Sequence, residues 1–169
     1  NAAIKLGVPE KALLKGVDSV NFCLSQGLGA PVGSVLCGNK EFINNARKIR
    51  KQLGGGMRQA GILAAAGIIA LESMVDRLEE DHQRALYLAE KLKDVPNITI
   101  RENSPQTNMV FLDLNESFPK TNIRVIEELK ELNVLIGTSR NRGFRLVTHV
   151  GITDQDIDIV LKSFQIVMN

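Results

Sequence analysis

Cysteine and histidine are scarce in this sequence, with two of each. Two cysteines, Cys23 and Cys37, are too few for a disulfide framework in a chain of 169 residues, so we expect a cytoplasmic protein with free, buried thiols. The two histidines, His82 and His149, lie far apart and not at ligand spacing with either cysteine. We therefore expect no metal site.

An excess of one charge and a long apolar run are also missing. The chain carries 21 basic and 19 acidic side chains, a balance that argues against nucleic acid or an anionic membrane as the main partner. The most apolar segment, residues 60–71, is too short to span a bilayer. Because a helix made of it is apolar all round, we expect it to be buried on nearly all sides, by missing sequence or by a partner subunit.

Hydrophobic periodicity divides the chain near Pro96. Residues 1–95 are expected to be rich in helix, with a hairpin of strands at 19–24 and 34–37, a helix at 40–53, and a long helix from about Met57 to Lys93 that bends near 76–81. Residues 96–169 are expected to form a small α+β unit, with strands at 97–101, 107–114, 134–138 and 144–148, a helix at 121–132 and a last helix capped by Thr153 and Asp156. The opening residues look like the tail of a helix stopped by Gly7 and Pro9, which is the pattern of a fragment.

Three glycines followed by Met57 and Arg58 form the clearest local signal for a ligand. If a helix begins just after residues 54–56, its free N–H groups and its dipole favour an anion there, and Arg58 in the first turn is then reasonable. The alternative is a loose joint between helices with a surface arginine. Lys51 is the member of the neighbouring basic run that lies closest to the glycines, although such a run is usually a solvated face.

Arg145 is predicted on a strand with alternating apolar neighbours. A guanidinium fork presented from a strand suits a carboxylate, while an ordinary exposed charge is the equally plain alternative. His149, at the end of the same strand, is predicted to be a turn histidine, and His82 is predicted to face solvent on a charged helix.

Gln26 stands where a buried strand runs into a glycine turn, in the sequence LSQGLG. Its amide is neither an acid, a base nor a nucleophile. The position is typical of a reactive side chain, so the glutamine needs an explanation.

Several segments together resemble one family over nearly the whole chain: SVNFCLSQGLGAPVGSVLCG, RKQLGGGMRQAGILAAAGIIAL, RLEEDHQRA, TNMVFL and FRLVTH. They are similar to the C-terminal half of the pyridoxal-phosphate-dependent L-threonine aldolases. The resemblance implies the aspartate-aminotransferase-like α/β fold (fold type I), with residues 1–95 as the C-terminal part of the large cofactor-binding domain and residues 96–169 as the small α+β domain. It also implies pyridoxal 5'-phosphate, a homodimer or homotetramer, and cleavage of L-threonine or L-allo-threonine to glycine and acetaldehyde.

By position in these motifs, Gln26 stands where the family has its Schiff-base lysine. Lys51 and Arg58 match cofactor-binding residues, and Arg145 matches an arginine that binds the substrate carboxylate. Gln26 cannot replace the lysine, because its amide nitrogen is delocalised, and the family's upstream half is absent. Three interpretations stay open: part of a lyase that is inactive alone, a non-catalytic relative that keeps the fold and assembly surfaces, and an engineered lysine-to-glutamine variant.

Overall fold

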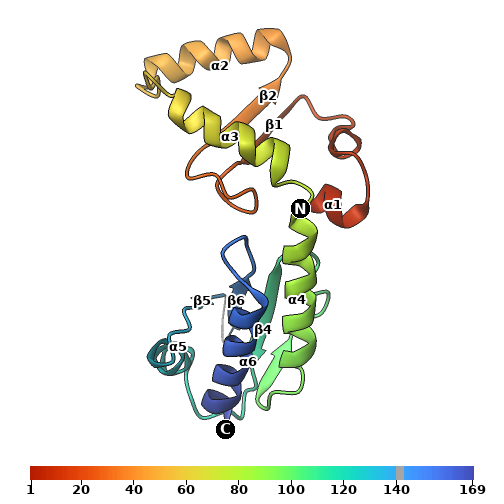
Figure 1. The fold of residues 1–169 in the computed structure, drawn as a ribbon, viewed down its shortest axis with the longest axis vertical. Coiled ribbons are helices and arrows are strands. Elements are labelled where there is room, and N and C mark those ends of the chain that lie inside the picture. The colour runs from red at the N-terminus through yellow and green to blue at the C-terminus, as the bar shows by residue number, and fades with distance from the viewer. Residues whose placement is uncertain (140–142) are drawn as a thin grey trace. The chain divides into compact units, whose positions relative to one another are not determined.

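A computed structural model describes residues 1–139 and 143–169. The chain forms two compact units, one of residues 2–78 and one of residues 79–169 with Asn1 (Figure 1). The units divide earlier in the chain than the expected boundary at residue 96. The reason is that helix α4 (Leu78–Leu92) packs with the C-terminal sheet rather than with the segment before it.

The first unit contains the predicted hairpin. Its strands β1 (Ser19–Cys23) and β2 (Ser34–Gly38) pair antiparallel, with Val20 opposite Cys37. The other elements of the unit are α1 (Ala2–Leu6), the 3-10 helix η1 (Glu10–Leu14), α2 (Lys40–Gln52) and α3 (Gly61–Ser73). Gly7, with a φ of 62°, follows α1 directly, in the left-handed conformation that commonly ends a helix.

The core of the first unit is small. Leu24, Ala30 and Ala70 are its buried members. The expectation that α3 is buried on nearly all sides is not met within this chain, because Ile62 and Ile69 are 83% and 61% exposed. The prediction of buried thiols is also wrong, since both cysteines lie on exposed positions of the hairpin.

The prediction of one long helix from Met57 to Lys93 is wrong about where the helix starts, and the structure has two helices in place of one. The glycines end α2 instead of starting a helix: the N–H of Gly54 bonds to the Lys51 carbonyl, and its φ of 77° is the left-handed conformation that closes helices. Helix α3 begins at Gly61 and ends at Ser73, and α4 begins only at Leu78. No helix among the described residues is long and apolar enough to cross a membrane.

The second unit is an antiparallel sheet covered by helices, in the predicted order β-β-α-β-β-α. Its strands lie in the order β3-β4-β6-β5. The bounds are β3 (Ile98–Ile100), β4 (Met109–Leu114), α5 (Asn122–Glu131), β5 (Gly137–Thr138), β6 (Gly143–Val147) and α6 (Asp154–Met168). Thr153 forms the predicted capping box with Asp156 at the start of α6.

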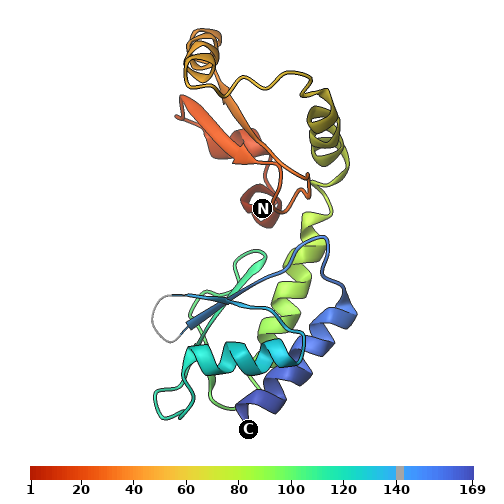
Figure 2. The ribbon, with the colours of Figure 1, turned by 90° about the vertical axis from the view of Figure 1, so that its left-hand side faces the viewer.

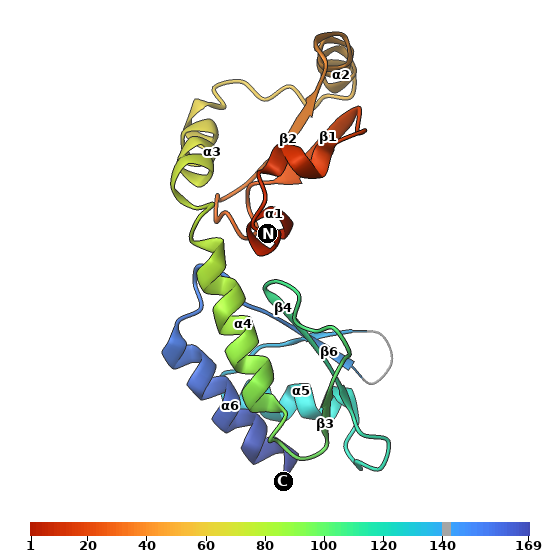
Figure 3. The same ribbon diagram turned by 90° about the vertical axis from the view of Figure 1, so that its right-hand side faces the viewer.

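The sheet of the second unit has one apolar face. Val110, Leu112 and Leu146 are buried with side chains of α4, α5 and α6 in a single core, while Met109 and Val147 on the same strands are exposed. Figures 2 and 3 show the ribbons of α4 and α6 running along this sheet. The alternation leaves the opposite face, which carries Arg145, open to solvent.

His82 is buried, contrary to the prediction that it faces solvent. Its ring is fully inaccessible, and its Nε2 lies 2.8 Å from the side-chain oxygen of Asn1. Charged neighbours on α4 misled the prediction, because Asp81 beside it is buried as well and its Nδ1 lies 3.7 Å from the carboxylate of Glu79.

Candidate functional site

The loop that carries Gln26 is closed by its own backbone. The N–H of Leu24 donates to the carbonyl of Gly33, and the carbonyl of Leu24 accepts from Ala30, both at 2.9 Å. The N–H of Gly29 donates to the carbonyl of Gln26, also at 2.9 Å. The side chain of Gln26 is exposed, and in the described part of the chain its amide has no hydrogen-bond partner.

Packing against α3 fixes the base of the same loop. The buried side chain of Leu24 lies over Gly67, where an added Cβ would stand 3.1 Å from its Cδ1. Leu24 also shares the small core with Ala30 and Ala70. The conformation of the loop therefore depends on Leu24 and on backbone hydrogen bonds, and not on the side chain at position 26.

Lys51 and Arg58 flank the glycine segment at the end of α2. Lys51 is exposed on the last turn of that helix, and its Cδ lies 3.4 Å from where a Cβ on Gly56 would be. Arg58 lies in the loop before α3, not in a first helical turn, so the expected helix N-terminus beside the glycines is absent from the described structure. An anion at this segment would meet two exposed cations, Lys51 and Arg58, neither of which has an ion pair among the described residues.

Arg145 is the third exposed cation that the sequence singled out. It lies in the middle of β6, opposite Phe111 of β4 and Gly137 of β5. Its strand neighbours Phe144 and Leu146 are buried, as the alternating pattern predicted. A second arginine on this sheet, Arg101, is held by Asp113, and this hydrogen bond raises the pKa of Arg101 above its ordinary value.

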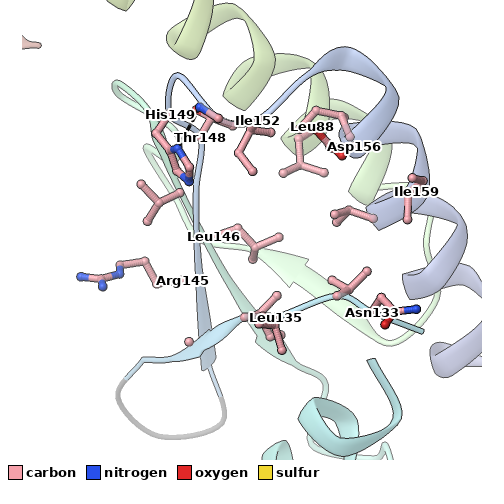
Figure 4. Close-up of a pocket in the computed structure, with 17 residues that line it drawn as sticks. Leu88, Asn133, Leu135, Arg145, Leu146, Thr148, His149, Ile152, Asp156 and Ile159 are labelled. Atoms are coloured by element: carbon pink, nitrogen blue, oxygen red, sulfur yellow. Dashed lines mark hydrogen bonds between the residues drawn. The ribbon is translucent and has the colours of Figure 1, made fainter. Parts of the chain in front are cut away.

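A pocket of about 670 Å³ opens on the other side of β6, between the segment that leads into β5 and helix α6. Figure 4 shows Leu146 and Ile152 on the pocket side of the strand, while the guanidinium of Arg145 points away from it. His149 lies at the turn after β6, where its Nδ1 accepts a hydrogen bond of 3.1 Å from the N–H of Gly151. This agrees with the prediction of a turn histidine. Arg145 is one of the residues that line the pocket, but its guanidinium points out of it.

The four predicted site residues are not joined to one another by any hydrogen bond or ion pair in the described part of the chain. Gln26, Lys51 and Arg58 belong to the first unit, and Arg145 belongs to the second. All four are exposed.

These residues fit pyridoxal phosphate in part. Lys51 and Arg58 are exposed, have no ion pair within residues 1–139 and 143–169, and lie beside a segment of glycine backbone, which suits a phosphate group. Gln26 offers no amine at the apex of its loop, so a covalent bond to the cofactor does not fit this position. These residues therefore suit the phosphate of the cofactor and do not suit a covalent link to it.

The sequence matches a family model and several curated proteins. The model for beta-eliminating lyases matches residues 1–115. Low-specificity L-threonine aldolase 1 of Arabidopsis thaliana is 42% identical over 165 residues, which cover 98% of this chain and 46% of that protein. The low specificity L-threonine aldolase of Escherichia coli K12 is 43% identical over 157 residues, which cover 93% of this chain and 45% of that protein. The chain spans about half the length of the curated relatives it matches.

Solved structures show the same fold. A protein from Exiguobacterium sp. 255-15, provisionally described as an aromatic amino acid beta-eliminating lyase/threonine aldolase, superposes with a TM-score of 0.79 at 16% identity, over 98% of this chain and 49% of that protein. The α/β fold is therefore the C-terminal part of the aspartate-aminotransferase-like fold (fold type I) that the sequence predicted. With its family model covering most of its length, the chain belongs to the beta-eliminating lyase family.

Proposed function

We propose that this chain is the C-terminal half of a pyridoxal-phosphate-dependent, threonine aldolase-like lyase, and that it is inactive by itself. The reaction is the retro-aldol cleavage of L-threonine or L-allo-threonine to glycine and acetaldehyde. The observation that carries the proposal is the identity of 42% to a threonine aldolase across 98% of this chain. The need for a second half follows from the share of that relative, 46%, that the chain covers.

Each exposed cation has a role in this proposal. Arg145, on the open face of the second sheet, binds the carboxylate of the amino-acid substrate through its guanidinium fork. Lys51 and Arg58 bind the phosphate of the cofactor. When bound, pyridoxal phosphate supplies the electron sink for breaking the bond between Cα and Cβ of the substrate.

Gln26 favours a second candidate function, a non-catalytic relative that keeps the fold and the assembly surfaces. An amide nitrogen is delocalised into its carbonyl and does not form the covalent link that a lysine amine forms. The loop around Gln26 is nevertheless closed by backbone hydrogen bonds, such as the one from Leu24 to Gly33, that do not involve the side chain at position 26. The two candidates therefore differ in one side chain, and a single substitution separates them.

We also propose that the protein is cytoplasmic and works as a homodimer or homotetramer. Support for assembly comes from α3, whose apolar side chains at Ile62, Ile68 and Ile69 are more than half exposed. Exposed apolar clusters of this kind are typical of surfaces that bind another chain.

The deciding experiment compares the natural protein with its Gln26→Lys variant. Both are assembled with the N-terminal half of an aldolase relative and supplied with pyridoxal phosphate, and acetaldehyde release from L-threonine is measured. The lyase proposal expects no activity with Gln26 and activity with lysine. No activity in either protein, with cofactor bound in both, supports the non-catalytic relative, while full activity of the natural protein contradicts the role given to position 26.

A further inference from the structure

Two arginines on the open face of the second sheet differ in how they are paired. Arg101 donates from Nε and Nη2 to the two carboxylate oxygens of Asp113, each at 2.7 Å, and from Nη1 to the hydroxyl of Ser139 at 3.2 Å. Arg145 is exposed and makes no hydrogen bond or ion pair through its guanidinium within residues 1–139 and 143–169. A bidentate pair of this kind holds the carboxylate in one orientation.

Asp113 lies within reach of both arginines. In the register of β4 and β6, Phe111 is opposite Arg145 and Asp113 is opposite Gly143, so Asp113 is the diagonal neighbour of Arg145 on the same face. Diagonal neighbours in an antiparallel pair stand about 7–8 Å apart, a gap that an extended arginine can bridge. Asp113 is also the one acidic residue in the sequences of β4 and β6.

Two further residues shape the place where the pair lies. The guanidinium carbon of Arg101 is 5.9 Å from the centre of the Phe111 ring. A Cβ at Gly143 would collide with both the Arg101 guanidinium and the Asp113 carboxylate. The pair therefore lies over Gly143, in a space that a side chain there would fill.

We propose that Arg101 is a positioning residue for the carboxylate site at Arg145. By binding both oxygens of Asp113, Arg101 keeps the nearest carboxylate of the sheet away from Arg145, whose guanidinium is left for a carboxylate from outside the chain. The identity of that ligand as an amino-acid carboxylate rests on the proposed function. The pairing of Asp113 with Arg101 rests on the sheet alone.

The test measures how fast phenylglyoxal modifies Arg145 in the full chain, followed by peptide mass spectrometry. This reagent reacts faster with a free guanidinium than with one bound to a carboxylate. In Arg101→Met, Asp113 turns to Arg145 and its modification slows about two- to fivefold, the factor expected from an exposed ion pair. In Arg101→Met with Asp113→Asn the rate returns to the natural value, and Arg124→Met, which removes an arginine from α5, leaves it unchanged.

Gly143→Ala provides a second route to the same state, because it displaces the pair while keeping both charges. Circular dichroism checks that each variant is folded. The proposal is supported if phenylglyoxal modifies Arg145 more slowly in Arg101→Met and in Gly143→Ala, and if adding Asp113→Asn restores the natural rate. An unchanged rate in both folded variants overturns it, as does slowing that Asp113→Asn does not reverse.

A separate arm adds glycine, the small amino acid that the proposed reaction releases. Protection of Arg145 by glycine in the natural chain, weakened in Arg101→Met, supports the ligand assigned to the site. If the variant rates behave as expected but glycine does not protect Arg145, the positioning by Arg101 stands and the carboxylate role under the proposed function is overturned.

Discussion

The hydroxyl of Thr148 donates a hydrogen bond of 2.6 Å to the backbone carbonyl of Asp81, which joins the end of β6 to the first turn of α4. Asn108 completes this buried contact by donating from its amide to the carbonyl of Thr148 at 2.8 Å. The strand that carries Arg145 is thereby attached to the helix and to the beginning of β4 through polar groups that water does not reach.

Thr148→Val keeps the shape of this side chain and removes its donor. Because a buried acceptor then loses a partner, we expect the free energy of unfolding to fall by about 1–3 kcal/mol. Urea denaturation followed by circular dichroism measures the change. Thr148→Ser, which retains the hydroxyl, is the matched control and should recover most of the loss; equal stability of the valine variant and the natural chain would contradict the role of this bond.

The capping box of α6 makes stability depend on pH. Hydrogen bonds from the hydroxyl and N–H of Thr153 lower the pKa of Asp156 below its ordinary value. Since folding lowers this pKa, the contribution is complete above the ordinary value of about 3.9 and is lost as pH falls through the lower, folded value.

We therefore expect Asp156→Asn to reduce the free energy of unfolding at neutral pH and to have little effect below the folded pKa of Asp156. The check is urea denaturation of both proteins at about pH 7 and at the lowest pH where the natural chain stays folded. Asp158→Asn, two residues further along α6 and outside this contact, serves as the control. If the difference in the free energy of unfolding between Asp156→Asn and the natural chain stays constant with pH, the carboxylate charge plays no part.

Two glycines in the first unit should respond in opposite directions to alanine. Gly54 has a φ of 77°, a conformation that costs an L-residue about 1 kcal/mol or more, so Gly54→Ala is expected to destabilise the end of α2. Gly61 starts α3 with no atom within 4 Å of an added Cβ, so Gly61→Ala is expected to stabilise the chain by about 0.4–1 kcal/mol. Thermal unfolding of the two variants measures whether each substitution raises or lowers the stability. Asparagine tolerates the left-handed conformation, so Gly54→Asn should lose less stability than Gly54→Ala.

Cys23 and Cys37 provide a reporter of assembly. Both thiols are exposed on the hairpin, so we expect both to react with Ellman's reagent in the folded chain without denaturant. The proposed function includes assembly with other polypeptides. If one of them covers the hairpin, the rates at which the two thiols react should fall on assembly. Single Cys→Ser variants assign the rates, and two thiols that react only after unfolding would contradict the exposure seen here.

The elements predicted best were those whose signal lies within a few neighbouring residues. The hairpin follows from apolar runs on either side of Gly27 and Gly33, and the capping box follows from Thr153 and Asp156 alone. Arg145 was placed correctly because alternation along five residues decides which side of a strand is buried.

Predictions failed where the outcome depends on distant packing. The glycines at 54–56 are compatible with either end of a helix, and the left-handed φ of Gly54 decides for the end of α2. His82 has charged neighbours along α4, yet the packing of that helix buries it. The Arg101–Asp113 pair was missed, although both residues lie in predicted strands, because only the sheet register brings them over Gly143.

The self-supporting loop around Gln26 has a genetic consequence. Glutamine and lysine codons differ in their first base alone, so one point mutation exchanges an amide for an amine at this apex. Leu24, Ala30 and Gly33 close the loop without help from the side chain at position 26. The mutation therefore breaks none of the hydrogen bonds or packing contacts that hold the loop. Under the proposed function, loss of the lysine anchor and its restoration are therefore equally short mutational steps, and neither requires the loop to be rebuilt.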